Sequence, residues 1–150
     1  MTTSPRDHFI DEISRVNRKL RTLFDARVKE RGLTLSRARV LLLLSRRDVL
    51  NQRDLAEELD IETPTLVRLL DGMQKQDFVE RRVMKGDRRA NQVVLTAHGR
   101  TMAAEVNRLA RDLRAELMSS IDERQIESAL GVLAAVGENI SLACGKGSHC

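Results

Sequence analysis

The sequence predicts a mainly α-helical domain that carries one small β-hairpin. Apolar residues recur every three or four positions through most of the chain, which is the period of an amphipathic helix. Between positions 79 and 95 the period changes to two, which is the period of a strand. The length of 150 residues suits a single domain with one hydrophobic core.

The first two helices are placed by an apolar stripe and by a capping residue. The stripe predicts a helix over residues 6–30, which Gly32 ends. Thr34 is a candidate N-cap for a second helix. The uninterrupted apolar run at 40–44 is typical of a helix in the centre of a core.

The third and fourth helices are short and follow each other closely. Asn51 is a good N-cap for the third helix. Thr63 is the candidate N-cap of the fourth, because Pro64 then occupies the first helical position, where proline is favoured. This helix is expected to run to about Gln76.

The rest of the chain predicts a hairpin and two long helices. Alternating residues from position 79 and a second strand from Val93 form the hairpin, with a charged tip at 85–90. Thr96 begins the fifth helix, and Asp122 begins the sixth. The expected fold class is therefore six helices plus a two-stranded hairpin.

Composition excludes several classes of protein. No uninterrupted apolar run approaches 18 residues, and the first residues do not resemble a signal peptide, so we expect a cytoplasmic protein without a membrane-spanning helix. The two cysteines, Cys144 and Cys150, exclude a disulfide framework, and an idle Cys144 thiol is favoured over a cross-link between two copies.

The sequence indicates neither an enzyme nor a cofactor. It contains no Gly-rich phosphate-binding loop, and its serines and cysteines lack a visible catalytic partner. His8, His98 and His149 are far apart, so we expect no metal site.

The charge balance favours a nucleic-acid binder. Lysine and arginine total 26 against 22 acidic residues, and the sequence pI is about 9.6. Residues 81–89 hold five cations and one anion. The absence of Trp and Tyr argues against a protein that stacks aromatic side chains on unpaired bases.

A short helix, a tight turn, a capped helix and a basic hairpin, in this order, predict a winged helix-turn-helix. One helix fits a major groove, where its N-terminal side chains reach base edges. The fourth helix buries its leucines and leaves another face free, although Asp71 lies near this face and would repel phosphate. The free face carries Thr63, Thr65, Arg68, Gly72 and Lys75, and the hairpin tip carries Arg88 and Arg89.

The stretch from Asp54 to Arg68, the wing Gly86–Ala90 and the exit Val94–Gly99 resemble the MarR family of bacterial transcription regulators, with the SlyA-type branch as the nearest match. The resemblance implies a winged-helix homodimer that represses or activates transcription from a pseudo-palindromic operator.

Matching positions of the family motif give roles to individual residues. The wing pattern Asp-x-Arg falls on Asp87 and Arg89, which implies that Asp87 orients the wing and that Arg89 enters a minor groove. Arg88 is then a phosphate contact, and Thr65 and Arg68 match the contact positions of the recognition helix. Thr63, Asn51 and Gln52 are further candidates for contacts with the phosphate backbone of DNA.

The resemblance also divides the single domain, 1–150, into regions. The DNA-binding lobe is expected at 34–96, the helical dimerisation region at 6–32 and 97–143, and a flexible tail at 144–150. The dimer is expected to form through the first and last helices. The residues predicted at the dimer interface are Phe9, Ile13, Val16, Leu113, Leu117, Ile126, Leu130, Leu133 and Ile140.

Many members of the family respond to small aromatic carboxylates or phenols, and such an effector would need a cation. Arg15, Arg18 and Arg39 are the candidates, and each is also a plausible surface charge. Two alternatives stay open from the sequence: a winged-helix module for protein–protein contact, and a nucleoid-associated regulator that needs no ligand.

Overall fold

The structure is a computed structural model that describes residues 4–83 and 91–145. The chain forms two compact units, one up to Leu113 and the other from Arg114 onward. The fifth helix passes from the first unit into the second. Each unit is described by itself.

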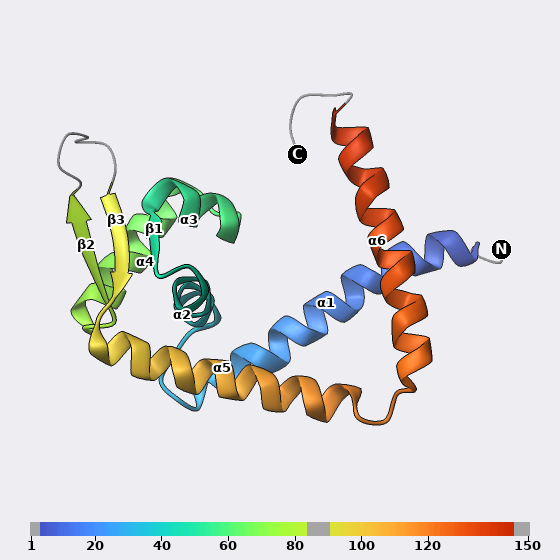
Figure 1. Ribbon diagram of the computed structural model, residues 1–150, viewed down its shortest axis with the longest axis horizontal. Coiled ribbons are helices and arrows are strands. Elements are labelled where there is room, and N and C mark those ends of the chain that lie inside the picture. Colours follow the sequence, from blue (N-terminus) through green and yellow to red (C-terminus); the bar gives the residue numbers. More distant parts are fainter. Residues whose placement is uncertain (1–3, 84–90, 146–150) are drawn as a thin grey trace. The chain divides into compact units, whose positions relative to one another are not determined.

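The described residues form six helices and three strands, in the order expected for a mainly helical fold (Figure 1). They are α1 (Pro5–Lys29), α2 (Leu35–Arg47), β1 (Val49–Asn51), α3 (Gln52–Leu59), α4 (Thr63–Lys75), β2 (Val79–Val83), β3 (Asn91–Leu95), α5 (Ala97–Met118) and α6 (Glu123–Gly145). The prediction of six helices with a small β wing is confirmed. α6 extends through Gly145, so it includes the first two residues of the predicted tail.

Side-chain caps begin several helices as predicted. The Thr34 hydroxyl accepts a hydrogen bond from the Arg37 amide at 3.3 Å, and the Asn51 side chain accepts one from the Asp54 amide at 2.7 Å. The prediction for α4 was wrong by one residue. Thr63 is the first residue of the helix and Glu62 is its N-cap, with extended backbone and no side-chain cap.

The sheet has a third strand that the sequence analysis missed. The order is β1-β3-β2, and both pairings are antiparallel. Leu50 of β1 and Arg81 of β2 both face Val93 of β3 in the register. β1 has only three residues, too few to show a period of two. In the order β1-β3-β2, β3 is the central strand and β2 lies at one edge of the described sheet.

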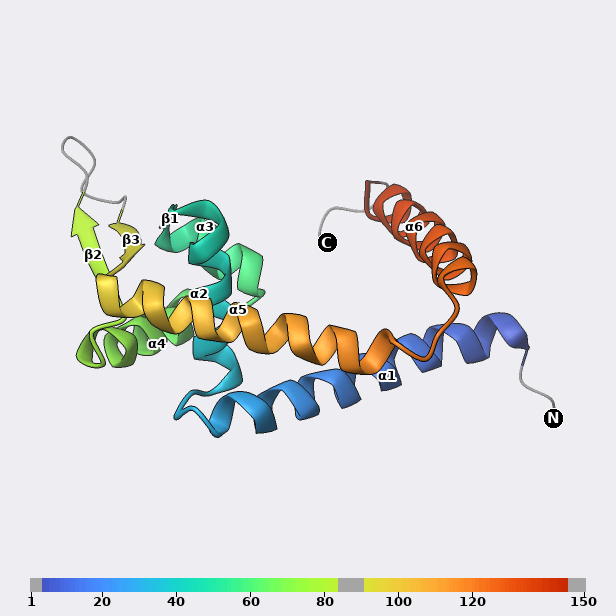
Figure 2. The same ribbon diagram turned by 60° about the horizontal axis from the view of Figure 1, so that its bottom comes forward.

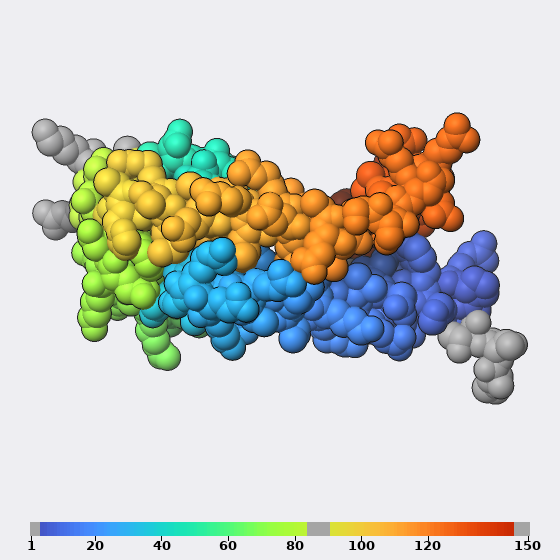
Figure 3. All heavy atoms as spheres, turned by 90° about the horizontal axis from the view of Figure 1, so that it is seen from below, coloured from blue at the N-terminus to red at the C-terminus, as the bar shows by residue number. Residues whose placement is uncertain are grey.

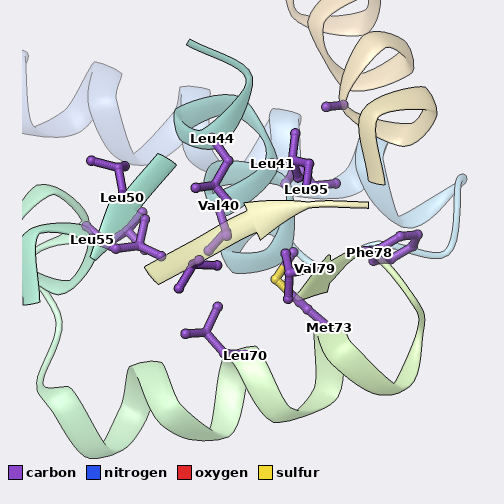
Figure 4. Close-up of a cluster of buried hydrophobic side chains, with 14 of the residues drawn as sticks. Val40, Leu41, Leu44, Leu50, Leu55, Leu70, Met73, Phe78, Val79 and Leu95 are labelled. Atoms are coloured by element: carbon purple, nitrogen blue, oxygen red, sulfur yellow. The ribbon is translucent and has the colours of Figure 1, made fainter. Parts of the chain in front are cut away.

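One apolar core holds α4 against α2 and the sheet. Leu66, Leu70 and Met73 of α4 are fully buried. Figure 4 shows Leu70 and Met73 pointing into the cluster that also contains Val79 of β2 and Leu41 of α2. Burial of each such side chain contributes about 1.5–3 kcal/mol, so the core fixes which face of α4 is turned outward.

The junction between α4, β2 and α5 requires a glycine at position 99. The Thr96 amide donates to the Phe78 carbonyl at 3.0 Å, and the Gly99 amide donates to the Thr96 hydroxyl at 2.9 Å. A Cβ added at Gly99 would lie 1.9 Å from the Phe78 carbonyl oxygen. The His98 and Phe78 rings stack beside this contact, with their centroids 5.1 Å apart.

We therefore predict that Gly99→Ala lowers the free energy of unfolding by about 1–3 kcal/mol, the usual cost of overpacking. Thermal or urea unfolding measures this change. Gly131→Ala is the matched control, because a Cβ at this α6 position meets nothing within 4 Å. Equal stability of the Gly99→Ala variant and the native chain would contradict the close contact.

α1 joins the core only through its C-terminal end. Val28 is fully buried, whereas Ile10, Val16 and Leu20 are exposed. Figures 1 and 2 both show the N-terminal half of α1 leading away from the sheet. The turn after α1 lies against α5 (Figure 3), where the Arg31 Nε atom is 4.0 Å from a Glu105 carboxylate oxygen.

Asp25 links the end of α1 to the start of α2. Its carboxylate accepts a hydrogen bond from the Leu35 amide at 3.2 Å and pairs with Lys29 at 2.8 Å. The hydrogen bond from Lys29 is the main cause of a pKa lowered from the ordinary value of 3.8.

Because the folded pKa of Asp25 is lowered, its stabilising effect is fully present above pH 3.8 and is lost as the pH falls through the folded value. Asp25→Asn is expected to flatten the dependence of stability on pH in this range. Urea unfolding at a series of pH values measures it, and an unchanged profile would contradict the assignment.

α6 exposes most of its apolar residues. It has no buried residue, and its mean hydropathy of 1.3 over an 18-residue window is high enough for a membrane span by length and composition. The search for uninterrupted apolar runs did not find α6 as a candidate membrane span, because charged and polar residues divide its apolar sequence. One such helix is weak evidence for a membrane span.

Cys144 lies near the C-terminal end of α6 and is disulfide-bonded. The prediction that Cys144 carries an idle, unpaired thiol was therefore wrong.

Candidate nucleic-acid interface

α3 and α4 form a helix-turn-helix with a tight, capped turn. Asp60 ends α3 in the left-handed conformation, with φ 53° and ψ 50°. This conformation is accessible to aspartate at a lower cost than to most other side chains. The Ile61 amide donates to the Ala56 carbonyl at 3.1 Å, which satisfies a carbonyl at the end of α3. The chain therefore turns into α4 within three residues.

The outer face of α4 carries the predicted contact residues together. Thr63, Thr65, Arg68 and Lys75 are all exposed, whereas the opposite face is buried in the core. Arg68 and Lys75 are seven residues apart, which places them on the same side of the helix. None of the ion pairs found in the described residues involves Arg68. Its guanidinium is thus available to an external partner.

Gly72 was also predicted on this face, but Arg37 covers it. A Cβ at Gly72 would lie 2.6 Å from an Arg37 guanidinium nitrogen. The same guanidinium, from the first turn of α2, donates to the Gln76 side chain. A cation from a distant part of the sequence therefore lies beside the C-terminal end of α4.

Asp71 was expected to repel phosphate, but its charge is paired. An Arg81 guanidinium nitrogen contacts the Asp71 carboxylate, and Arg81 Nε donates to the Gln74 side chain at 3.1 Å. Arg81 counts among the five cations near the wing, yet only 22% of its side chain is exposed. Sequence reasoning missed this pair because it joins a helix to a strand ten positions later.

The start of α3 holds the two further candidates for phosphate contacts. The Asn51 side-chain oxygen accepts the hydrogen bond that caps α3. The Gln52 side-chain oxygen is buried and has no hydrogen-bond partner in the described chain. A phosphate would bind to the side-chain NH2 groups, which donate, and not to these oxygens. The phosphate contacts assigned to these two residues stay predictions.

The wing strands lead toward the basic tip. β2 and β3 pair from Val79 with Leu95 to Val83 with Asn91. Arg82 on β2 pairs with Glu80 at 3.3 Å, and both are exposed. Asp87, Arg88 and Arg89 lie outside the described residues, so their roles stay predictions.

The three arginines predicted to bind an effector do not share one hollow. Arg15 and Arg18 line a shallow hollow on α1, and Arg15 pairs with Glu12 at 2.9 Å. Arg39 is on α2, is half-buried and does not line this hollow.

A separate cavity of about 460 Å³ lies between the end of α2, the sheet and the start of α5. Several of its polar groups are already paired within the chain: Asn107 donates to Ser45 at 3.1 Å, and Arg100 donates to the Leu95 carbonyl at 3.1 Å.

Most of the residues predicted at a dimer interface are exposed in the single chain. These are Ile13, Val16, Leu117, Leu130, Leu133 and Ile140. Phe9 and Ile126 are half-buried, whereas Leu113 is only 4% exposed and already packs within the chain.

The helix-turn-helix followed by a two-stranded wing defines a winged-helix protein. The family model described as "MarR family" matches residues 31–90. The crystal structure of the transcriptional regulator PA3341 is 35% identical to this chain, with a TM-score of 0.79, and the match covers 89% of this chain and 98% of that one. This chain belongs to the MarR family of transcriptional regulators.

Further solved structures share the fold. A MarR transcriptional regulator from Methanosarcina mazei Go1 is 27% identical, with a TM-score of 0.76 and coverage of 88% of this chain and 96% of that one. A mutant of MarR from E. coli in complex with operator DNA is 22% identical, with a TM-score of 0.75 and coverage of 89% and 99%.

Proposed function

We propose that this chain is a regulator that binds a specific double-stranded DNA operator as a homodimer. One observation carries the proposal: the core holds the inner face of α4 and leaves Thr65, Arg68 and Lys75 exposed together directly after a tight turn. The family consists of transcriptional regulators rather than enzymes. The solved complexes of E. coli MarR and S. aureus MepR with DNA support this use of the fold.

Each proposed contact follows from side-chain chemistry. Arg68 would donate two hydrogen bonds to one guanine edge, and Thr65 would touch a thymine methyl group or a phosphate. Lys75, together with Thr63 at the positive end of the helix, would bind phosphate. At the wing, Arg89 would enter the minor groove, with Arg88 on phosphate and Asp87 orienting the loop.

The homodimer is proposed from the exposed apolar faces of α1 and α6. α6 has no buried residue, and α1 exposes Ile13 and Val16 along its N-terminal half. Exposed apolar residues gathered along a helix are typical of a surface that another protein covers. A two-fold dimer requires a pseudo-palindromic site with half-site centres about 10 bp apart.

Regulation by a small aromatic carboxylate or phenol, and placement in the SlyA-type branch, stay predictions from the sequence. The main alternative to an operator-binding regulator is a winged-helix module whose basic wing binds an acidic protein. The second alternative is a nucleoid-associated regulator that needs no effector. A cytoplasmic location is proposed because operator DNA is found there.

Fluorescence anisotropy tests the proposal with two duplexes, the intergenic DNA beside the chain's own gene and a shuffled copy. We expect a Kd of about 10⁻⁸ to 10⁻¹¹ M for the first and at least a thousandfold preference over the second. Weak, equal binding to both duplexes that falls steeply with salt would indicate phosphate attraction alone. This result would contradict an operator beside the chain's own gene and would favour a distant operator, a nucleoid-associated role or a protein partner for the wing.

A further inference from the structure

We propose that Arg81 is a positioning residue that sets the angle between the recognition helix α4 and the wing, and so determines specificity without reading a base. This inference rests on the proposed function. It gives Arg81 a role different from that of the exposed cations, which would bind phosphate. Asp71 and Gln74 are the residues of α4 that Arg81 contacts, and they join the wing to the helix.

The link consists of two contacts from one guanidinium. Arg81 Nε donates to the Gln74 side chain at 3.1 Å, and a terminal nitrogen pairs with the Asp71 carboxylate. Asp71 and Gln74 are three residues apart, so they are neighbours on the surface of α4. A guanidinium presents its donors on separate nitrogens in a fixed planar fork, whereas lysine carries all its donors on one nitrogen, so lysine does not reproduce this two-nitrogen geometry.

The position of Arg81 in the sheet explains why the link matters. Arg81 is the central residue of β2, an edge strand that pairs only with β3 in the described sheet. Within β2 only Val79 is buried in the core, and the side chains after it are half-buried or exposed. The Arg81 fork therefore ties the outer part of the wing to α4. It holds the two proposed DNA-contacting elements in one geometry before DNA binds.

The link also accounts for an acidic residue beside a DNA-binding face. A free carboxylate there would repel phosphate, and its removal would raise the affinity for every DNA sequence. A carboxylate that holds Arg81 has the opposite effect on the operator. Its removal releases the wing, so operator affinity falls even though the protein becomes more positive. Asp71→Asn thus separates the two roles by the sign of the change.

The experiment measures operator and shuffled-duplex affinity by fluorescence anisotropy for Asp71→Asn, Arg81→Lys and the double variant. We expect each single variant to lose about three- to tenfold in operator affinity, with no loss on the shuffled duplex. Because both act on one link, the double variant should lose no more than the worse single variant. Glu80→Gln is the matched control: it removes a carboxylate on β2 that pairs with Arg82, so discrimination should stay unchanged.

Melting temperature and hydrogen exchange show whether the change is one of positioning. We expect unchanged melting temperatures and faster amide exchange in residues 74–83 of the free Asp71→Asn variant. Equal gains in affinity for both duplexes, additive losses, or unchanged exchange would overturn the inference. If the native chain itself does not discriminate, the proposed function fails and this inference fails with it. Discrimination by the native chain together with an unaffected Asp71→Asn variant overturns this inference alone.

Discussion

Arg68→Ala is expected to weaken operator binding by about 1–3 kcal/mol and to relax the preference at one base pair of each half-site. Arg68 is exposed on the outer face of α4, and no ion pair found in the described residues involves it. Its loss therefore removes a contact to DNA without removing one within the protein. Anisotropy with a set of single-base operator variants measures both effects.

Two control variants distinguish base recognition by Arg68 from a phosphate contact. Lys75→Ala should weaken all duplexes by a similar factor and lower the slope of affinity against salt by about one, as a phosphate contact does. Arg108→Ala, at an exposed position on α5, should change neither quantity. If Arg68→Ala behaves like Lys75→Ala, then Arg68 is a phosphate contact and the assignment of base recognition is wrong.

Removal of α6 is expected to yield a monomer or an insoluble chain. The helix exposes Leu130, Leu133 and Ile140, and no residue of it is buried. A chain that ends at Asp122 loses this apolar surface. A monomer binds one half-site, so the affinity for the full operator should fall by about 10²- to 10⁴-fold. Sedimentation analysis and anisotropy measure the two effects.

A point variant keeps this prediction testable if the truncated chain does not fold. Leu130→Glu combined with Leu133→Glu places charge on an exposed face, so the chain itself should fold normally. It should sediment as a monomer, whereas Glu138→Gln on the same helix should sediment like the native chain. A stable dimer in the double variant would show that α6 does not form the interface.

Local signals predicted most of the helical fold. Thr34 and Asn51 mark helix starts because their side chains satisfy amides within three residues, and this requires no knowledge of the rest of the chain. Gly99 also stood in a recognisable motif, although only the structure shows the Phe78 carbonyl that requires it. β1 escaped prediction because three residues gain strand geometry only from pairing with β3.

The sequence predicted which residues of the candidate site are exposed, but not the contacts that join its helices and strands. The exposed face of α4 follows from helical period alone, so Thr65 and Arg68 were found correctly as exposed neighbours. The contacts of Arg81 with Asp71 and of Arg37 with Gln76 depend on how separate elements pack. No periodicity encodes such contacts. The sequence therefore indicated a repulsive Asp71 where the structure has an ion pair.

Selection from a random pool of duplex DNA shows whether this chain is a sequence-specific homodimer, because the selection assumes no knowledge of the target gene. The full chain is incubated with the pool at physiological salt, and bound DNA is sequenced over several rounds. We expect one enriched pseudo-palindromic motif with half-site centres about 10 bp apart. A pool that stays without an enriched motif, or that enriches a single unpaired half-site, would contradict a sequence-specific homodimer.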